Sequence, residues 1–426
     1  MEENKIRFAK DDRNMELQDL GLYIHVPFCA RKCHYCDFLS GPANETTIQK
    51  YFHALYKEIE SYQGKTEDYL VKTVFFGGGT PSLVNASYIK EVMLRLREYF
   101  RFDQDNPEIT LEINPGTITR DKLLLYRDLG INRLSFGLQS TNNQDLKLLG
   151  RIHSFEEFLE NYQLARELGF KNINIDLISA IPGQTLESWE KTLEEVLGLN
   201  PEHISAYSLI IEENTPFYDL YSPGSPNEKE LPGEDIDRQI YSKTKELMQE
   251  HSYQRYEISN YAKAGYECRH NISYWTGKDY LGLGLGSASL INGARFSNMH
   301  DLAQYIENCA KLEKEQNQKS NLSQGEKPLQ KPSIKNHPIQ IRRDYIELTK
   351  NQQMEEFMFL GLRMCHLGIS KQKFQEQFQL DIHEVYGNVL HKLISNYLLE
   401  EEGDRIRLTD YGIDISNGVL AEFLLD

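Results

Sequence analysis

The stretch HVPFCARKCHYCDF, residues 25–38, brings three of the chain's six cysteines within eight positions. Cys29, Cys33 and Cys36 follow the spacing C-x3-C-x2-C, and three neighbouring thiolates suit a soft metal centre. A structural zinc would need a fourth ligand, which one of the two histidines in the stretch could supply. A [4Fe-4S] cluster held by three protein thiolates would instead leave one iron open to a substrate or cofactor. The cysteine spacing by itself is compatible with both centres.

The composition excludes several classes of protein. The chain has 426 residues, enough for two or three domains, with 40% hydrophobic and 26% charged residues. Its 47 Lys and Arg against 64 Asp and Glu give a net charge of −17, so we expect no binding to nucleic acid. No apolar run is long enough for an integral membrane segment, and the first fifteen residues hold no hydrophobic signal core. Six cysteines are too few for a disulfide scaffold, which favours a cytoplasmic protein with reduced thiols.

Short apolar strands alternate with amphipathic helices between residue 21 and about residue 210. The strands are expected at 21–26, 73–77, 109–114, 133–139, 173–178 and 203–209. One helix is expected at 155–169, where apolar residues recur at helical spacing and Gly169 supplies a stop. Six consecutive βα units indicate an α/β fold with a parallel sheet, curved into a full or partial TIM-like barrel.

Three of these strands carry polar residues on one face. Glu112, Gln139 and Asp176 lie near the carboxyl ends of strands whose alternate residues are apolar. Barrel enzymes hold their ligands at the carboxyl ends of the strands, whereas a barrel interior that serves stability alone is branched and apolar. Three polar faces in register therefore favour a polar ligand over an inner face satisfied by water.

The pattern changes after residue 235. A helix is expected at about 235–250, and a strand pair at about 398–410 predicts a small winged-helix-like α+β domain at the end of the chain. Residues 311–345 are polar and lack periodicity, which is typical of a mobile insertion or linker. The expected division is an N-terminal lead (1–20), a barrel (21–235), a barrel extension (236–310), a polar insertion (311–350) and a C-terminal domain (351–426).

The second expected strand leads directly into glycines. TVFFGGGTPS, residues 73–82, contains the run Gly77–Gly79, which lets the backbone approach a ligand closely. It is not a P-loop, since no Gly-Lys-Ser/Thr follows. In this order, the cysteine loop and the glycine motif resemble those of the radical S-adenosylmethionine superfamily. The resemblance implies a [4Fe-4S] cluster on Cys29, Cys33 and Cys36 with S-adenosylmethionine on the open iron, where reduction cleaves the sulfonium.

Further motifs narrow the resemblance. LYIHVPFC, FFGGGTPS, LEINPGT, LSFGLQS, LGRIHS and DLISAIPGQT occur in the order and approximate spacing of the coproporphyrinogen dehydrogenase-related branch of that superfamily. Matched position by position, the resemblance implies that Tyr23, Gly78 and Glu112 contact the cluster-bound S-adenosylmethionine. The residues implied around a second S-adenosylmethionine or substrate are Tyr35, Gly79, Thr80, Gln139, Arg151 and Asp176.

Two subfamilies of that branch differ at the cysteine loop. Oxygen-independent coproporphyrinogen III dehydrogenases carry a further cysteine two residues after the third, where this chain has Phe38, and a longer arm before the cluster. The chain instead resembles HemW-type haem chaperones in CDF at 36–38, in HNISYW at 270–275 and in its C-terminal motifs EEFMFLGLRMCHLGI and LTDYGIDISNGVLAEFL. This resemblance implies a protein that binds haem as cargo and passes it to apo-haemoproteins, with a ferredoxin or flavodoxin as electron donor. The alternative is an enzyme, either the dehydrogenase or a related radical S-adenosylmethionine methyltransferase.

The HNISYW motif supplies the candidate haem contacts. His270 could equally be an ordinary core histidine, and the aromatic residues beside it could be ordinary packing. A neutral imidazole beside aromatic faces is also a suitable haem-iron or porphyrin site. Following the motif, haem contact is expected at His270, Asn271, Tyr274 and Trp275, and the sequence assigns no catalytic residue.

Overall fold

The computed structural model of the chain describes residues 17–322, 333–336 and 339–425. All six strands predicted in the first half of the chain are present, and they lie side by side in chain order and run parallel. The fourth has the predicted bounds, whereas the first begins three residues early. The six strands are β1 (Gln18–Val26), β2 (Tyr69–Gly78), β3 (Glu108–Ile113), β4 (Arg133–Gln139), β5 (Ile173–Ser179) and β6 (His203–Ser208).

Further strands extend this sheet at both edges. They are β7 (Gln254–Arg255), β8 (Asn260–Ala262), β9 (Tyr280–Leu283), β10 (Ala288–Ile291), β11 (Ala294–Asn298) and β12 (Arg342–Glu347). The complete order is β12-β11-β10-β9-β1-β2-β3-β4-β5-β6-β8-β7, in which β9 is parallel to β1 and the other added strands are antiparallel to their neighbours. The sheet has two free edges, so the barrel is the partial one expected.

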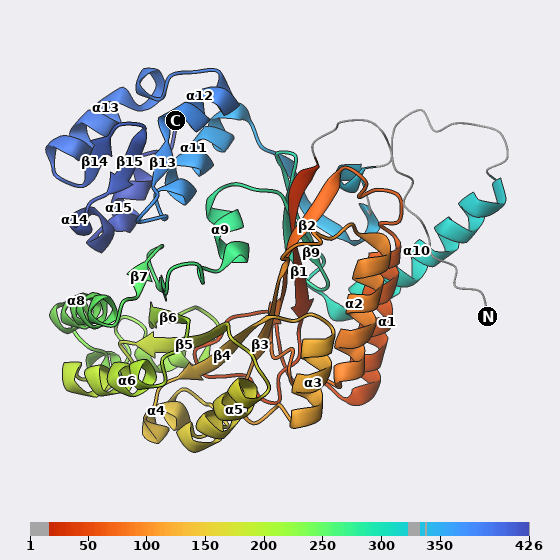
Figure 1. The fold of residues 1–426 in the computed structure, drawn as a ribbon, viewed down its shortest axis with the longest axis horizontal. Helices are drawn as coiled ribbons and strands as arrows, with labels where there is room; N and C mark the ends of the chain where they lie inside the picture. Colours follow the sequence, from red (N-terminus) through yellow and green to blue (C-terminus); the bar gives the residue numbers. More distant parts are fainter. Residues whose placement is uncertain (1–16, 323–332, 337–338, 426) are drawn as a thin grey trace.

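Helices of the βα units cover the outer face of this sheet (Figure 1). They are α1 (Glu45–Glu60), α2 (Ala86–Tyr99), α3 (Arg120–Asp128), α5 (Phe155–Glu167), α6 (Leu186–Gly198) and α8 (Glu234–Glu250). The short helices α4 (Asn143–Leu148) and α7 (Pro216–Tyr221) instead contact the cysteine loop, since His34 Nδ1 donates to the Leu148 carbonyl oxygen and the Phe217 backbone N–H donates to the His34 carbonyl oxygen. The helix predicted at 155–169 is α5, which begins with a capping box between Ser154 and Glu157. Gly169 follows this helix with a φ of +88°, a conformation that favours glycine.

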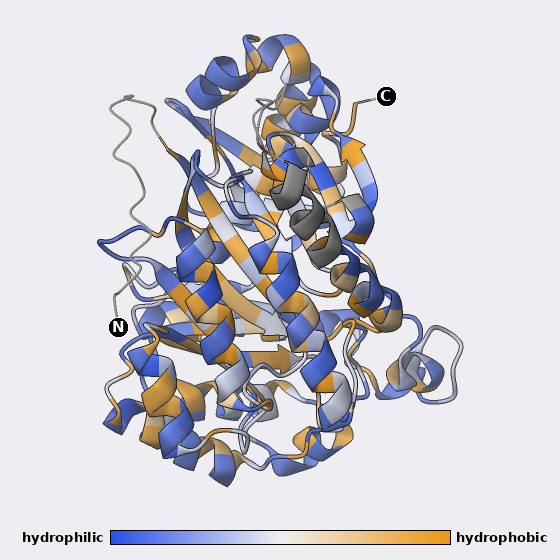
Figure 2. Cartoon of the chain, turned by 90° about the vertical axis from the view of Figure 1, so that its right-hand side faces the viewer, coloured by the Kyte–Doolittle hydropathy of each residue, from blue (hydrophilic) through white to orange (hydrophobic). Residues whose placement is uncertain are grey.

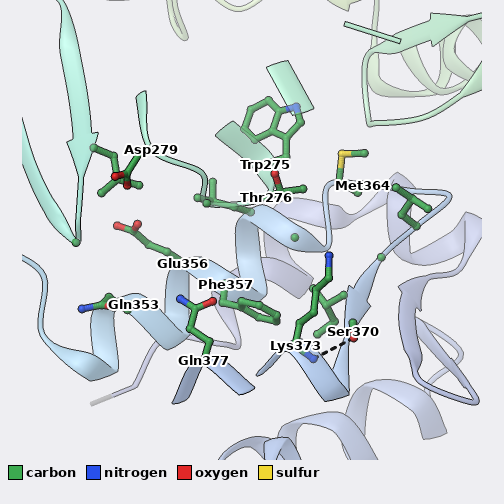
Figure 3. A pocket seen from close by; sticks show the side chains of 18 of the residues that line it. Trp275, Thr276, Asp279, Gln353, Glu356, Phe357, Met364, Ser370, Lys373 and Gln377 are labelled. Atoms are coloured by element: carbon green, nitrogen blue, oxygen red, sulfur yellow. Dashed lines mark hydrogen bonds between the residues drawn. The ribbon is translucent and has the colours of Figure 1, made fainter. Parts of the chain in front are cut away.

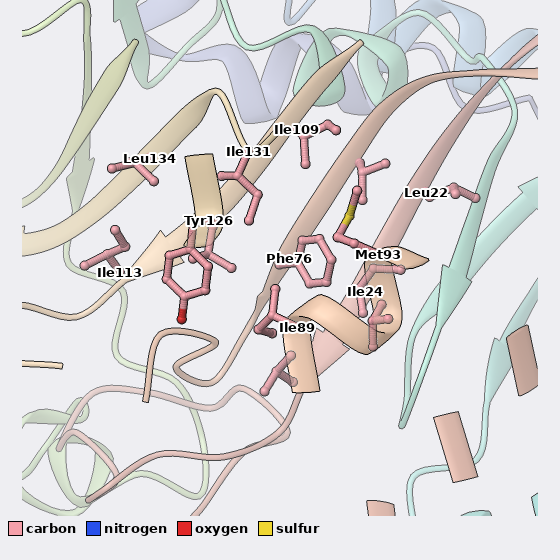
Figure 4. Close-up of a cluster of buried hydrophobic side chains, with 14 of the residues drawn as sticks. Leu22, Ile24, Phe76, Ile89, Met93, Ile109, Ile113, Tyr126, Ile131 and Leu134 are labelled. Carbon is pink, nitrogen blue, oxygen red and sulfur yellow. The ribbon is translucent and has the colours of Figure 1, made fainter. Parts of the chain in front are cut away.

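The main core lies between the strands and these helices. Figure 4 shows Leu22, Ile24 and Phe76 from β1 and β2 packed against Ile89 and Met93 of α2. Each of these side chains is fully buried. In Figure 2, apolar strands run behind helices whose outward sides are mostly hydrophilic. The alternation along each strand thus buries one face against helices and leaves the other face for the inside of the partial barrel.

A buried carboxylate ties α1 to the turn that follows β9. Glu58 accepts hydrogen bonds from the backbone N–H of Gly284 at 2.8 Å, the side-chain amide of Asn298 at 2.7 Å and the hydroxyl of Tyr305 at 2.5 Å. Complete burial raises the pKa of Glu58 from 4.5 to about 7, because these three donors offset only part of the lost hydration.

The C-terminal residues form a smaller domain with its own core. Its elements are α11 (Lys350–Gly361), β13 (Ile369–Ser370), α12 (Lys371–Phe378), α13 (Ile382–Ser395), β14 (Leu399–Glu402), β15 (Arg405–Leu408), α14 (Asp410–Asp414) and α15 (Ser416–Ala421). The strands form an antiparallel sheet in the order β13-β15-β14, which confirms the strand pair predicted at 398–410 and the α+β class. The domain lies beside α9 (Arg269–Trp275) and above α8 in Figure 1.

The region expected to be a polar insertion, residues 311–350, contains regular structure at both ends. α10 (Leu302–Leu322) continues into it, and the short 3-10 helices Ile334–Asn336 and Ile339–Ile341 precede β12. Outside this region, a further 3-10 helix, Glu228–Glu230, lies before α8. β12 was hidden from the hydrophobic pattern because it is an edge strand whose residues are mostly exposed. Residues 323–332 and 337–338 of the insertion, and 1–16 of the expected lead, lie outside the described residues.

Candidate functional site

The three cysteines of the opening motif lie on the loop between β1 and α1 and line one cavity. The loop is fixed at its base, where the Cys29 backbone N–H donates to the Gly41 carbonyl oxygen at 3.0 Å. It is also fixed across the barrel, where Arg31 Nη2 donates to the Gly150 carbonyl oxygen at 2.7 Å. The thiols therefore occupy a loop held at the carboxyl end of the parallel strands, where such sheets place their ligands.

The two histidines of the motif are engaged elsewhere. His25 Nε2 donates to the Leu39 carbonyl oxygen at 2.9 Å, and its Nδ1 accepts from the Tyr23 hydroxyl at 3.1 Å. His34 Nδ1 donates to the Leu148 carbonyl oxygen at 2.9 Å. Neither histidine lines the cavity that the three thiols share. The structure therefore offers no support for a zinc site completed by either ring.

The donor set fits a polynuclear cluster better than a single ion. Throughout residues 17–322, 333–336 and 339–425, no three His, Cys, Asp or Glu side chains are grouped as around one metal ion. A [4Fe-4S] cluster binds each thiolate at a different iron, so it needs thiols that surround a space. Two thiols also have donors nearby, since the Thr80 hydroxyl lies 3.6 Å from Cys29 Sγ and Arg151 Nη1 lies 3.6 Å from Cys33 Sγ. Donors to sulfur are a means by which proteins tune such clusters.

The glycine motif forms the floor beneath the cysteine loop. Gly78 has a φ of +108°, and its backbone N–H donates to Glu112 Oε2 at 3.2 Å. A Cβ atom at Gly79 would lie 2.8 Å from backbone atoms of Val26 and Phe28. Glycine is therefore needed at Gly78 for its backbone conformation and at Gly79 for close contact with the start of the cysteine loop.

Two carboxyl groups face each other across the inner side of the barrel. Desolvation, and then the charge of Asp176, raise the pKa of Glu112 from 4.5 to about 8. Burial also raises the pKa of Asp176, although Asn174 Nδ2 donates to this carboxylate at 2.7 Å and the Ser135 hydroxyl donates at 3.2 Å. Perturbed carboxyl groups in a cavity are typical of sites that bind cationic or hydroxyl-bearing ligands.

The end of β4 is built around Gln139 and Arg151. Gln139 has a φ of +77°, which is strained for a residue with a side chain, and the register of β4 shifts between Gly137 and Gln139. A Cβ at Gly137 would lie 3.0 Å from Gln139 Nε2 and 3.2 Å from Arg151 Nη2. Arg151 Nη2 also donates to Asn114 Oδ1 at 2.7 Å. Gly137 thus lets both side chains approach the same part of the cavity.

The structure brings together nearly all residues predicted to contact S-adenosylmethionine. Tyr23 is the exception among them, since it stands beside this cavity and stacks on Phe75 with ring centroids 6.3 Å apart. The predicted residues that line the cavity together with the three cysteines are Tyr35, Gly78, Gly79, Thr80, Glu112, Gln139, Arg151 and Asp176.

The candidate haem residues lie on α9 and are not brought to one place. His270 is buried at the amino end of the strands, with Nδ1 2.8 Å from Thr73 Oγ1 and Nε2 2.8 Å from the Tyr274 hydroxyl oxygen. Asn271 lines the inside of the barrel, whereas Trp275 faces the C-terminal domain. Figure 3 shows Trp275 at the pocket between α9 and that domain.

A second cavity of about 500 Å³ adjoins the first inside the barrel. The two cavities share Tyr35, Phe38 and several inner polar residues of β3, β4 and β5. The second also contains Arg133, Tyr207 and Asn271. Sequence reasoning missed Arg133 because this residue begins its strand, far from the carboxyl ends where ligands were sought. Its inward position could have been found from the alternation with Ser135 and Gly137.

Comparisons with known proteins agree with this geometry. The radical SAM superfamily model matches residues 23–196, and the HemN C-terminal domain model matches residues 348–415. A Bacillus subtilis protein named heme chaperone HemW is 34% identical over 402 residues, covering 94% of this chain and 98% of that protein. The chain belongs to the HemW family. The Escherichia coli heme chaperone HemW is 39% identical to this member over 274 residues, covering 64% of this chain and 70% of the other.

A solved structure extends the likeness of this HemW-family chain to its fold. The coproporphyrinogen III oxidase HemN from Escherichia coli, described as a radical SAM enzyme, superposes with a TM-score of 0.75 at 25% identity. The match covers 96% of this chain and 90% of the oxidase. Within the described residues of this HemW-family member, no helix has the length and apolar character needed to cross a membrane.

Proposed function

We propose that the protein binds haem and delivers it to apo-haemoproteins, and that it carries a [4Fe-4S] cluster with S-adenosylmethionine on the open iron. The observation that carries the proposal is full-length likeness to proteins named heme chaperone HemW, combined with three thiols around one cavity. Phe38 stands where the related dehydrogenases are expected to have a fourth cysteine, and this difference supports the chaperone over the enzyme.

In this proposal the cluster is held by Cys29, Cys33 and Cys36. When bound, the cluster and S-adenosylmethionine supply one-electron reduction of a sulfonium, with a ferredoxin or flavodoxin as donor. Glu112 would contact the S-adenosylmethionine, and its carboxyl group would ionise more readily beside a cationic group of that cofactor. Tyr23, on β1, would help to position the S-adenosylmethionine, and its own side chain is fixed by the hydrogen bond from its hydroxyl to His25.

The remaining inner residues would hold a second S-adenosylmethionine or a substrate. Asp176 accepts one hydrogen bond from Ser135 on the neighbouring strand β4 and one from Asn174 on its own strand, so its carboxylate is fixed in orientation and can accept further bonds from hydroxyl or ammonium groups. Arg151 donates a hydrogen bond to Asn114 and lies close to Cys33. It would therefore lie between the second ligand and the cluster. The other residues assigned to this position are Tyr35, Gly79, Thr80 and Gln139.

Haem contact is assigned to α9, with different roles for its residues. Burial and the charge of Arg133 lower the pKa of His270 to about 3, so its imidazole is neutral, as an iron ligand must be. His270 can bind iron only after Nε2 gives up the Tyr274 hydroxyl or Nδ1 gives up Thr73. Asn271 already faces the inner cavity, and Trp275 offers an aromatic face at the C-terminal domain.

The dehydrogenase remains the second candidate, because the fold likeness to the HemN oxidase spans nearly the whole chain. An inner cavity of about 500 Å³ beside the cysteine loop could hold a tetrapyrrole in either function. Conversion of substrate therefore distinguishes the two proposals, and occupancy of the cavity alone does not.

The test combines haem titration with an enzyme assay on the anaerobically reconstituted protein. We expect stoichiometric haem uptake in the Soret absorbance, transfer to an apo-haemoprotein, and no consumption of coproporphyrinogen III in the presence of S-adenosylmethionine and reductant. The variant His270→Ala should weaken uptake, whereas Thr73→Val, which loosens the same helix but keeps the imidazole, should retain it. Absence of haem uptake together with consumption of coproporphyrinogen III would replace the chaperone by the dehydrogenase.

A further inference from the structure

Arg133 is a buried cation for which the described residues provide no hydrogen-bond partner. Its side chain lies inside the barrel and is 2% exposed. Among the described residues, its Nε has no hydrogen-bond partner and no carboxylate lies within ion-pair distance of its guanidinium. Burial of a charge is costly unless the charge is paired and hydrogen-bonded. A guanidinium with free donors at the wall of a cavity therefore has capacity for an acceptor brought by a ligand.

The two carboxylates whose charge acts on Arg133, Glu108 and Asp176, are hydrogen-bonded to other groups. Glu108 accepts the backbone N–H groups of Arg269 and His270, each at 3.0 Å, and so fixes the first turn of α9. Asp176 accepts from Asn174 and Ser135, as described above. Both carboxylates act on Arg133 through charge without bonding to it. Structural pairing therefore does not account for the guanidinium donors.

Two neighbouring polar groups are also without partners. Thr110 is the register partner of Arg133 on β3, and its buried hydroxyl has no hydrogen-bond partner among the described residues. Asn271 lines the same cavity as Arg133, and no hydrogen bond of its side-chain amide is present in the described part of the chain. Asn271 in the cavity and Thr110 beside Arg133 in the sheet are thus two polar groups near one cation that have no partner among the described residues.

The opposite end of the cavity is apolar and open. Phe38, Tyr207 and Ile210 line it and are 62%, 40% and 67% exposed. Arg133 and Gln139, at the two ends of β4, both line the cavity, which spans about 20 Å at 3.3 Å per residue. Exposed apolar side chains at the rim of a pocket favour a ligand with an apolar body.

Charge restricts where an anionic group can sit in this cavity. Asp37, Glu112, Asp176 and Glu212 also line it, and Arg133 is its only Lys or Arg among the described residues. An anion therefore meets only carboxyl groups along the upper walls, and among the described lining residues it finds a cation at the floor alone. A carboxylate would meet a planar guanidinium, whose fork geometry allows two parallel hydrogen bonds.

We propose that the inner cavity binds an amphiphilic carboxylate, with its carboxylate group on Arg133 and Asn271 and its apolar body beneath Phe38, Tyr207 and Ile210. The assignment of that carboxylate to a propionate of a tetrapyrrole rests on the proposed haem function. The other source of the same chemistry is the carboxylate of S-adenosylmethionine. In both cases α9 contributes to the carboxylate site through Asn271.

The test changes the ligand first, so that it does not depend on a variant. Binding of protoporphyrin IX and of its dimethyl ester to the full-length reconstituted protein is compared by fluorescence. We expect the free acid to bind about tenfold more tightly than the ester, a difference of about 1.4 kcal/mol, because only the acid can form charge-assisted hydrogen bonds with the guanidinium. Arg133→Gln should abolish this difference by weakening only the acid, and Arg133→Lys should restore part of it. Arg120→Gln, an exposed arginine on α3, serves as the control.

The outcomes separate the inference from its alternatives. A dissociation constant for S-adenosylmethionine that rises in Arg133→Gln, with equal binding of acid and ester, would identify S-adenosylmethionine as the source of the carboxylate. If neither ligand depends on Arg133, the inference is wrong. A structural role predicts that Arg133→Gln lowers the unfolding midpoint, whereas we expect it unchanged or raised, because an unpaired buried charge is removed. Discrimination of acid from ester without haem transfer would retain this inference and reject the chaperone.

Discussion

Thr73 Oγ1 and His270 Nδ1 lie 2.8 Å apart, in residues separated by 197 positions of sequence. The contact joins β2 to α9 at the amino end of the barrel strands. The His270 ring also stacks on Phe75, with centroids 5.2 Å apart. The helix that carries the HNISYW motif is therefore an integral part of the barrel floor.

The variant Thr73→Val tests the energetic role of this contact. It keeps the shape of the side chain but leaves His270 Nδ1 buried without a partner. We expect the free energy of unfolding to fall by about 1–3 kcal/mol, the cost of an unsatisfied buried polar group. Urea unfolding of the apo-protein measures the loss. Thr276→Val, which removes an exposed hydroxyl bonded to the Ile272 carbonyl oxygen, should change stability by less than about 0.5 kcal/mol. Equal losses in both variants would contradict a special role for the floor.

Glu58 predicts a specific pH dependence of stability. Its folded pKa of about 7 lies above its ordinary value of 4.5, so the folded protein retains this proton over a range in which the unfolded chain has lost it. Stability is therefore highest below about pH 4.5 with respect to this group, and decreases as the pH rises to about 7. The contribution is on the order of 3 kcal/mol at 1.36 kcal/mol per pKa unit.

The Glu58→Gln variant isolates this contribution. We expect its free energy of unfolding to vary less between pH 4.5 and 7 than that of the wild type, whatever its absolute stability. The exposed Glu67→Gln should leave the slope of the wild type unchanged. Chemical denaturation at four or five pH values provides the measurement, and parallel curves for wild type and Glu58→Gln would show that Glu58 does not titrate in this range.

The cysteine loop makes a prediction about iron loading. Each of Cys29→Ala, Cys33→Ala and Cys36→Ala should lose the iron and sulfide bound after anaerobic reconstitution, because each thiolate holds a different iron. Cys365→Ala, in the C-terminal domain, should load as the wild type does. Iron and sulfide analysis with visible absorbance gives the result. Retention of the full cluster in a single variant of the loop would exclude that cysteine as a ligand.

Gly79→Ala should damage the site by contact with backbone. The added Cβ would lie 2.8 Å from atoms of Val26 and Phe28, which cannot move without displacing the start of the cysteine loop. We expect a loss of about 1–3 kcal/mol in stability, typical of overpacking, together with reduced cluster content. Gly41→Ala is the matched control in the same loop, since no atom lies within 4 Å of its added Cβ. Thermal unfolding and iron analysis of both variants decide whether close approach is required.

Local patterns predicted the first half of the fold well, because each βα unit carries its own signals. The alternation in Ile173, Ile175 and Leu177 identified a strand, and the same alternation placed Asp176 inside the barrel. The inner polar set and the cysteine loop could therefore be predicted to meet, and they line the same cavity.

Contacts between distant segments could not be predicted in this way. Nothing local to HNISYW indicates that Glu108 fixes the first turn of its helix, or that both nitrogens of His270 are engaged. The edge strand β12 has no buried face to create a hydrophobic pattern. The lack of a hydrogen-bond partner for Arg133 among the described residues is equally a property of the assembled barrel, since the groups around it come from other strands and from α9.

The position of β1 has a consequence for the order in which the protein is made. β1 lies between β2 and β9, and Gly21–Ile24 pair with Tyr280–Leu283, about 260 residues later in synthesis. Until that later segment leaves the ribosome, one edge of the strand that carries the cysteine loop has no neighbour. Contacts of such large sequence separation form late, because closing a long loop is slow. If the loop holds the proposed cluster, we therefore expect the cluster to be inserted after translation, when both edges of β1 are paired.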